Sequence, residues 1–216
     1  MTPMMEQYFE VKDKYKDYIL FYRLGDFYEM FFEDAQVASR ELELTLTGRD
    51  CGEEQRAPMC GVPYHSAEGY IGKLISAGYK VAICEQTEDP ALAKGLVKRE
   101  VIRVVTPGTL IESTLLPETR NNYLAALYSD DGSFGICFCD ISTAYMTSTV
   151  ITGADAETLL ANELSTYMPR EIISNVAFAD IEAVSKWLAE KDGRVLYSQL
   201  PDKFTRENSD KAHERF

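Results

Sequence analysis

The chain has 216 residues, more than the common domain size of about 100 to 150 residues, which predicts two domains. Hydrophobic residues make up 45% of the chain, enough to fill two separate cores. Its apolar runs are broken by charge or glycine within a few residues and its start is acidic, so a membrane span and a signal peptide are excluded and we expect a cytoplasmic protein. The formal net charge of -13 argues against an autonomous DNA-binding domain, because such domains usually present a basic face.

The first half of the chain predicts mixed α/β structure. A helix with Pro3 at its first position is expected to run to about Tyr15, and Gly25-Asp26 between two aromatic-rich runs predicts a tight hairpin. The elements that follow are, in chain order, a helix to about residue 41, a strand over 42–46, a long functional-type loop over 47–64, a helix over 66–77, and strands over 79–85 and 101–106.

The second half predicts a second α/β unit. Residues 107–121, with two prolines and a glycine, have the composition of a connection between domains. The expected elements after it are strands over 123–128, 134–141 and 144–151, a helix over 155–167, a strand over 171–174 and a helix over 180–191. This βββαβα order resembles the ribonuclease H-like layout. From Lys203 onward the sequence is polar and shows no core pattern, as a frayed end or a severed helix would.

Phe27 and Glu29 lie on the strand that leaves the predicted hairpin turn. Because side chains alternate along a strand, both project to the same side, close to the tip. A phenylalanine can be driven between stacked bases, and a nearby acid can hydrogen-bond the edge of the base that loosens. The pair therefore suits a probe of the base stack. On pattern alone, a ring in so aromatic a run is more often part of the core.

Four motifs stand in order along the first half: Gly-Asp-Phe-Tyr-Glu over 25–29, Pro-Met-Cys-Gly-Val-Pro-Tyr-His over 58–65, Val-Ala-Ile-Cys-Glu-Gln over 81–86, and Val-Val-Thr-Pro-Gly-Thr over 104–109. With them the chain closely resembles the N-terminal part of the bacterial MutS family, the DNA mismatch-recognition ATPases. The resemblance is densest over residues 2–110 and continues more loosely to residue 200. It implies that Phe27 and Glu29 contact the mispaired base.

The resemblance also implies a domain plan and partners. We expect a mismatch-recognition domain over 1–107, a linker over 108–121, a ribonuclease H-like connector domain over 122–200, and a tail over 201–216 that leads into a missing lever region. The family's partners are mismatched double-stranded DNA and MutL, which docks through the connector domain, and the complete protein is a homodimer. No membrane partner is implied.

The chain contains no Gly-x-x-x-x-Gly-Lys-Ser/Thr motif, so no phosphate-cradling loop and no ATP chemistry are assigned to it. We expect a fragment that is not itself an enzyme and needs no cofactor. The resemblance implies that the complete protein is a DNA-dependent ATPase that uses ATP and Mg²⁺ through domains outside this sequence.

Basic residues are locally in excess over 94–103, where four cations face only one acid. Such a cluster can hold a few phosphates, although a solvated strand edge carries charge in the same way. The family resemblance favours phosphate contact. The candidates for contact with the DNA backbone are Arg49, Met59, Lys94, Lys98 and Arg99.

A second hypothesis comes from the ribonuclease H-like layout, since paired carboxylates in such a fold can hold two metal ions for a nuclease. Asp140 lies on a predicted strand, and Asp130, Asp131 and Glu163 are available. The aspartates at 130 and 131 are also what a turn tip favours, so a structural role explains them more simply. A third reading, a protein-interaction module, is favoured for residues 122–200.

The five cysteines are an odd number and include no Cys-x-x-Cys pair. Cys137 and Cys139 stand two apart on a predicted strand, which makes them same-face neighbours rather than a bridge. We expect reduced thiols and no metal site.

Overall fold

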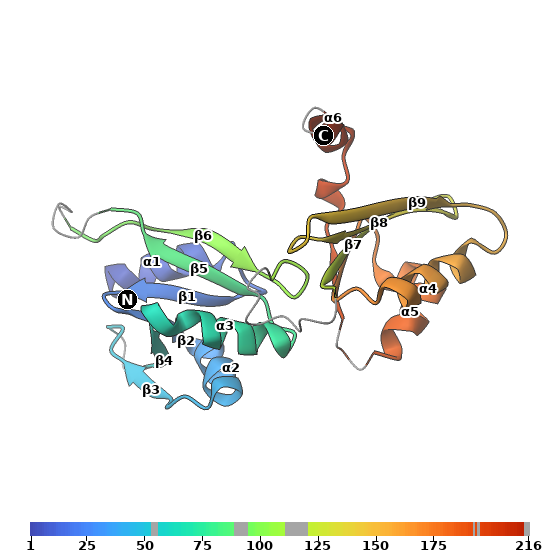
Figure 1. Cartoon of the computed structure of the whole chain (residues 1–216). Coiled ribbons are helices and arrows are strands. Elements are labelled where there is room, and N and C mark those ends of the chain that lie inside the picture. The colour runs from blue at the N-terminus through green and yellow to red at the C-terminus, as the bar shows by residue number, and fades with distance from the viewer. Residues whose placement is uncertain (53–55, 89–94, 111–120, 192, 194, 214–216) are drawn as a thin grey trace. The chain divides into compact units, whose positions relative to one another are not determined.

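The computed structural model of this chain describes residues 1–52, 56–88, 95–110, 121–191, 193 and 195–213, and it divides the chain into two compact units, Met1–Thr106 and Pro107–Phe216. Each unit combines helices with one mixed β-sheet (Figure 1). The mixed α/β class predicted from the sequence is confirmed. In the part of the chain that is described, no helix has both the length and the apolar character needed to cross a bilayer.

The first unit is built on one sheet with helices on both faces. Its described strands are β1 (Ile19–Leu24), β2 (Phe27–Phe31), β3 (Thr47–Arg49), β4 (Ala57–Pro63), β5 (Val81–Gln86) and β6 (Arg99–Val105). Their order across the sheet is β3-β4-β2-β1-β5-β6, with β1 and β5 parallel and the other neighbours antiparallel. The helices are α1 (Pro3–Lys12), α2 (Phe32–Leu42) and α3 (Ala67–Ser76), with a short 3-10 turn, η1 (Tyr64–Ser66), before α3. Figure 1 shows α1 on one face of the sheet and α2 and α3 on the other.

An aromatic cluster joins α1 to the sheet. Met5 and Tyr8 are the buried residues of α1, and they pack onto strand residues that alternate inward from β1 and β2. The Tyr8 ring stands edge-on to Tyr22 at 5.5 Å and to Phe31 at 5.1 Å between ring centroids. Each edge-to-face pair of this kind contributes about 0.5–1.5 kcal/mol of stability beyond that from the apolar area it buries. The N-terminal helix thereby fixes the face of the hairpin from which Phe27 and Glu29 project.

The hairpin between β1 and β2 has the predicted two-residue turn. Leu24 pairs directly with Phe27, so Gly25 and Asp26 alone connect the strands. Gly25 has a φ of 57°, in the left-handed region that glycine adopts without steric cost. In the same register, Tyr22 stands opposite Glu29.

Two expectations for residues 42–64 are wrong. The predicted strand over 42–46 is not formed, because α2 continues to Leu42 and ends where Glu43 takes a left-handed φ of 56°. The predicted loop over 47–64 contains β3 and β4, which pair with each other, and β4 also pairs along the whole of β2. Glycine and proline suggested a loop here because the strand that pairs with β4 lies about 30 residues earlier, so no neighbouring residue indicates the pairing.

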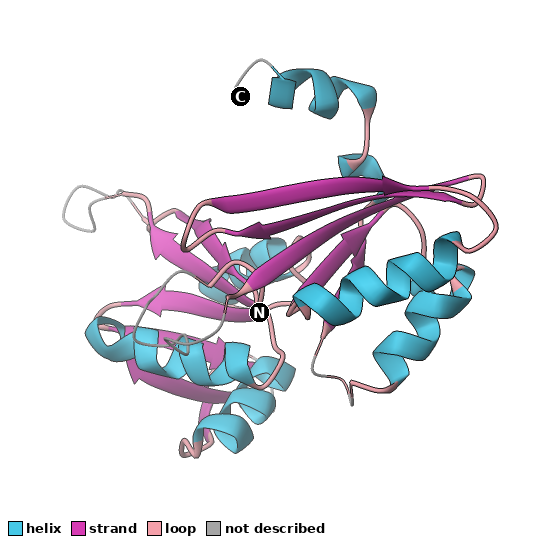
Figure 2. Ribbon diagram, turned by 45° about the vertical axis from the view of Figure 1, so that its right-hand side comes forward, coloured by secondary structure: helices cyan, strands magenta, loops and turns pink. Residues whose placement is uncertain are grey.

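The second unit is a five-stranded sheet in its described part. Its strands are β7 (Tyr123–Asp130), β8 (Ser133–Asp140), β9 (Tyr145–Ile151), β10 (Glu171–Ser174) and β11 (Leu196–Gln199), in the order β11-β10-β7-β8-β9. The helices α4 (Ala156–Tyr167) and α5 (Glu182–Ala189) pack on one face (Figure 2). The predicted βββαβα order is confirmed, and β11 extends it with a parallel edge strand.

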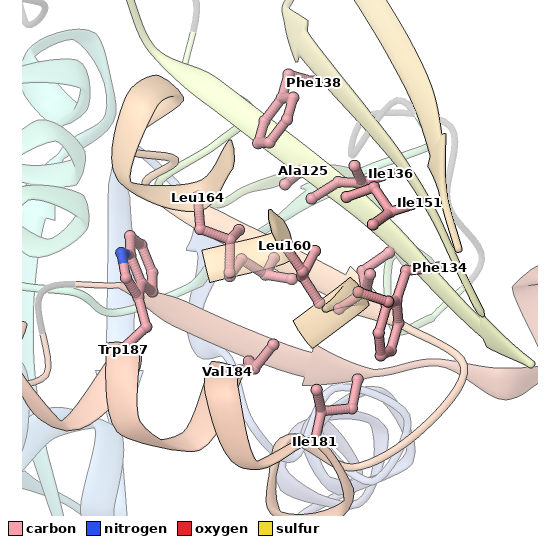
Figure 3. Close-up of a cluster of buried hydrophobic side chains, with 13 residues drawn as sticks. Ala125, Phe134, Ile136, Phe138, Ile151, Leu160, Leu164, Ile181, Val184 and Trp187 are labelled. Carbon is pink, nitrogen blue, oxygen red and sulfur yellow. The ribbon is translucent and has the colours of Figure 1, made fainter. Parts of the chain in front are cut away.

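The core of this unit lies between the sheet and the two helices. Figure 3 shows Leu160 and Leu164 of α4 and Trp187 of α5 directed toward Phe138 and the other apolar residues of the sheet. The Trp187 indole keeps its polar atom satisfied by donating to Ser165 Oγ at 3.0 Å. Helical spacing on α4 and strand alternation on β8 explain this core without any functional role for its residues.

The end of the chain carries a short 3-10 turn, η2 (Phe178–Asp180), before α5, a second, η3 (Pro201–Lys203), and a helix, α6 (Arg206–His213). The described side chains of α6 are exposed, in agreement with the absence of a core pattern there. Phe204 is half-buried, with its ring 6.1 Å from that of Tyr128 on β7.

Candidate functional site

The tip of the β1–β2 hairpin, residues 25–29, presents one large apolar side chain to solvent. Phe27 is 47% exposed, whereas Tyr28, the next residue, is 7% exposed. This difference follows from strand alternation, which turns Tyr28 into the sheet's other face. Phe27 pairs with Pro63 of β4 on one side and with Leu24 of β1 on the other. The backbone of Phe27 is therefore paired with a strand on each side, and its ring stands at the tip of the hairpin.

Glu29 lies on the same side of β2 as Phe27 but is much less exposed, with 15% of its side chain accessible. Its carboxylate forms an ion pair with Arg49 at the end of β3. Because β4 lies between β2 and β3, the Glu29 side chain has to cross β4 to make this pair. It crosses at Gly61, where an added Cβ would stand 3.4 Å from Glu29 Cγ and 3.2 Å from the Tyr28 carbonyl oxygen.

Arg23 braces the turn from the end of β1. Its guanidinium lies over the Tyr64 ring at 3.6 Å from the centroid, its Nε donates to the Gly25 carbonyl oxygen at 2.6 Å, and its NH1 donates to Glu85 at 3.3 Å. The backbone N–H of Tyr64 donates to the Asp26 carbonyl oxygen at 3.0 Å. These contacts tie the two turn residues to η1 and β5.

Tyr28 completes this support beneath the tip. Its hydroxyl donates to the Glu85 carboxylate, which Arg23 also contacts. Burial, with the hydrogen bond to Glu85 adding to it, raises the pKa of Tyr28 above its ordinary value, so the phenol stays a donor. Sequence reasoning missed Arg23, Tyr64 and Glu85 as a cluster. The only signal was that Tyr64 and Glu85 stand within two of the four motifs.

Arg99, predicted to contact a phosphate, is bonded within the first unit. It is 7% exposed, and its guanidinium donates to the carbonyl oxygens of Arg23 at 2.8 Å and Val97 at 2.9 Å and to Gln7 Oε1 at 3.0 Å. A guanidinium this buried would have to give up these bonds to reach a DNA phosphate. Arg99 links β6, β1 and α1 and has a structural role.

The other backbone candidates have different surroundings. Lys98 is exposed and forms an ion pair with Glu100 at 2.6 Å. Arg49 is 36% exposed in its side chain and is paired with Glu29. Met59 is half-buried on β4, where the Thr47 hydroxyl approaches its sulfur at 3.8 Å. Lys94 lies outside the described residues.

Asp140, the carboxylate first considered for a metal-dependent nuclease, is 1% exposed and bound to its own turn. It accepts from the backbone N–H of Asn122 at 3.1 Å, and from the N–H and hydroxyl of Ser142 at 3.0 and 2.6 Å. Burial alone would raise the pKa of Asp140, but these hydrogen bonds outweigh it and lower the pKa below its ordinary value. An ionised aspartate that stabilises a strand end accounts for this site.

The remaining carboxylates of the nuclease hypothesis do not gather around Asp140. Asp130 and Asp131 are exposed at the β7–β8 turn, where Asp131 has a φ of 44°, and Glu163 is half-buried on α4. Within the described residues, no three histidine, cysteine, aspartate or glutamate side chains are placed to hold one metal ion. The described cysteines are free thiols.

Comparison with known protein families covers almost the whole chain. A family model described as MutS domain I matches residues 2–114, and another described as MutS domain II matches residues 122–214. The chain belongs to the MutS family. The two family domains correspond to the two units of the fold, and the hairpin tip lies in domain I.

Relatives named DNA mismatch repair protein MutS agree with this assignment. The chain is 58% identical to the protein of Acetivibrio thermocellus over 204 residues, which is 94% of this chain and 23% of that protein. It is 61% identical to the protein of Lachnoclostridium phytofermentans over 178 residues, 82% of this chain and 19% of that protein. A Clostridium tetani protein is 58% identical over 175 residues, 81% of this chain and 20% of that protein. The chain spans about a fifth of the length of these relatives.

Proposed function

We propose that this chain reads mismatched base pairs in double-stranded DNA, with Phe27 as the probe. The observation that carries the proposal is the 47% exposed ring of Phe27 at a hairpin tip that Arg23, Tyr64 and Glu85 brace from below. An exposed ring at the end of a hairpin, with its backbone paired on both sides, suits insertion between bases. The names of the relatives supply the biological setting, DNA mismatch repair.

Selectivity then comes from the DNA rather than from a base code. Driving a ring into a stack costs a few kcal/mol for the base step that opens. A mispaired site has already lost part of its pairing and stacking, so it opens at a lower cost than a matched site. A firmly held Phe27 is needed for this test, because a mobile ring would yield to the stack instead of opening it.

Glu29 contributes a hydrogen bond to the base that loosens. A purine N7 is only an acceptor and an ionised carboxylate is only an acceptor, so their hydrogen bond requires a proton on Glu29. Insertion beside phosphates favours that proton, since both desolvation and negative surroundings penalise the charged carboxylate. A base that offers an N–H, such as thymine, is met equally well by the ionised form.

The second unit acts as a connector in this proposal. Asp140 is bound by hydrogen bonds at its own turn, and no three described histidine, cysteine, aspartate or glutamate side chains are placed to hold one metal ion, so a protein-interaction role is favoured over metal-dependent catalysis. By the family resemblance it relays the state of the DNA site to MutL and to an ATPase domain that uses ATP and Mg²⁺. The same resemblance makes the working form a cytoplasmic, nucleoid-associated homodimer, with no catalytic residue contributed by this chain.

The test uses the longest protein encoded by the reading frame that contains this chain, called the encoded protein below. Phe27→Ala is introduced into this protein. Competition between mismatched and matched duplexes should show mismatch preference for the parent and none for the variant, with weak salt-dependent binding remaining. Phe178→Ala is the matched control, because Phe178 is 45% exposed but lies in the second unit. It should retain the parent's preference. Equal discrimination by parent and Phe27→Ala would contradict the proposal.

A further inference from the structure

We propose that Arg49 exchanges partners when DNA binds: it holds Glu29 in the free protein and moves to a backbone phosphate in the complex, which releases Glu29 to the base. This inference rests on the proposed function and adds a residue that links backbone contact to base reading. The starting observation is the ion pair between Glu29, the residue expected to meet the base, and Arg49 on β3, which β4 separates from β2.

The ion pair draws Glu29 away from the position that base contact needs. Phe27 is 47% exposed, yet the Glu29 side chain on the same side of β2 is 15% exposed, because it crosses Gly61 toward β3. A carboxylate that is bound to a guanidinium is ionised and accepts only, so it cannot donate to a purine N7. In the free protein, therefore, the Glu29 carboxylate is directed toward Arg49 and cannot donate a hydrogen bond to a purine N7.

Arg49 has the properties of a residue that can change partners. It ends β3, which is an edge strand of the sheet, and 36% of its side chain is accessible. The guanidinium fork binds a phosphate as well as it binds a carboxylate, in both cases through paired N–H donors. One anion replaces another, so the loss of the Glu29 pair is offset when the phosphate contact forms.

Such an exchange makes base reading depend on DNA contact. When Arg49 moves to a phosphate, the half-buried Glu29 loses its counter-ion and requires a new partner. A loosened base at a mispair supplies that partner, and an intact base pair does not. The cost of releasing Glu29 is therefore recovered on mismatched DNA and not on matched DNA, which adds to the discrimination that Phe27 provides.

A double-mutant cycle on the encoded protein tests the exchange. Arg49→Gln, Glu29→Gln and the double variant are titrated with matched and mismatched duplexes. If Arg49 has to leave Glu29 on binding, Glu29→Gln tightens matched binding in the parent by removing a pair that must be broken. In the Arg49→Gln background, Glu29→Gln should also tighten matched binding, but the gain in affinity should be about fivefold smaller than in the parent. This factor of about five corresponds to the loss of one partly exposed ion pair.

Lys186→Gln is the control background, because Lys186 is an exposed cation of the second unit that is paired with a different carboxylate, Glu182. There the effect of Glu29→Gln should equal its effect in the parent. An effect of Glu29→Gln that is equal or larger in the Arg49→Gln background overturns the exchange. Failure of the proposed function is distinguished from this result, because it would appear as a parent without mismatch preference or as a preference that survives Phe27→Ala.

Discussion

The hairpin tip, residues 25–29, and the basic segment, residues 98–103, belong to one sheet but use their side chains in different ways. Phe27 is 47% exposed above a braced turn. In the basic segment, Arg99 is 7% exposed and engaged on three sides, and Lys98 and Arg103 pair with Glu100 at 2.6 Å and Glu68 at 3.6 Å. A locally positive sequence therefore leaves little unpaired charge for DNA, whereas a single apolar ring remains available. On the proposed function, mismatch selectivity and DNA affinity therefore have separate origins.

The largest effect follows from that separation, because a probe without phosphate contacts cannot hold DNA. The isolated 216-residue chain, with a net charge of -13, should bind a labelled mismatched duplex with a Kd weaker than about 100 µM at physiological salt. Fluorescence anisotropy on the chain alone measures this directly. A tight, mismatch-specific complex of the isolated chain would show that the affinity resides in these two units after all.

The structural role of Arg99 predicts the next largest effect. Arg99→Ala removes a buried guanidinium together with the hydrogen bonds that it donates to Gln7 Oε1 and to the carbonyl oxygens of Arg23 and Val97, and it should lower the free energy of unfolding of the first unit by about 3 kcal/mol. Urea unfolding followed by amide hydrogen exchange in β1 and β6 measures the loss.

Two controls make the Arg99 experiment specific. Trp187, the chain's one tryptophan, lies in the second unit, so its fluorescence should report an unchanged unfolding midpoint there. Lys98→Ala should leave the first unit unchanged, because Lys98 is exposed. A stable Arg99→Ala variant would return Arg99 to the group of possible phosphate contacts.

A smaller effect is expected at Glu29. Glu29→Gln supplies a donor without charge, so the encoded protein should bind matched duplex about tenfold more tightly and discriminate less. Titrations of both duplexes from pH 5 to 8 provide the comparison. Loss of affinity for both duplexes at every pH would rule out a protonated carboxyl.

The smallest effect concerns Lys98, whose side chain is 60% exposed, against 38% for Arg103 in the same segment. If it contacts a phosphate, Lys98→Ala in the encoded protein should weaken matched and mismatched binding alike and reduce the salt slope by about 0.9. The slope of log affinity against log salt concentration is the measurement. A changed mismatch preference at an unchanged slope would contradict a phosphate role.

Sequence reasoning succeeded where the determinants are local. The Gly25-Asp26 turn, the alternation that separates Phe27 from Tyr28, and the order of strands and helices in the second unit all follow from neighbouring residues. The position of Phe27 at the tip could therefore be predicted from the turn.

What could not be predicted depends on partners that are distant in the sequence. The strand β4 forms because β2 pairs with it, and Arg99 is buried because Gln7, 92 residues away, receives its guanidinium. The bracing of the turn likewise joins Arg23 to Glu85, 62 residues away. A count of charges along the sequence cannot detect such pairs.

The most direct test of the central claim is whether Phe27 enters the base stack. A duplex with 2-aminopurine beside a mispair reports unstacking as increased fluorescence. Binding of the encoded protein should raise this fluorescence, and Phe27→Ala, at concentrations that saturate the same duplex, should leave it near the value of free DNA. Phe178→Ala should behave as the parent does. An equal rise with parent and Phe27→Ala would show that the base stack opens without this ring and would contradict the account.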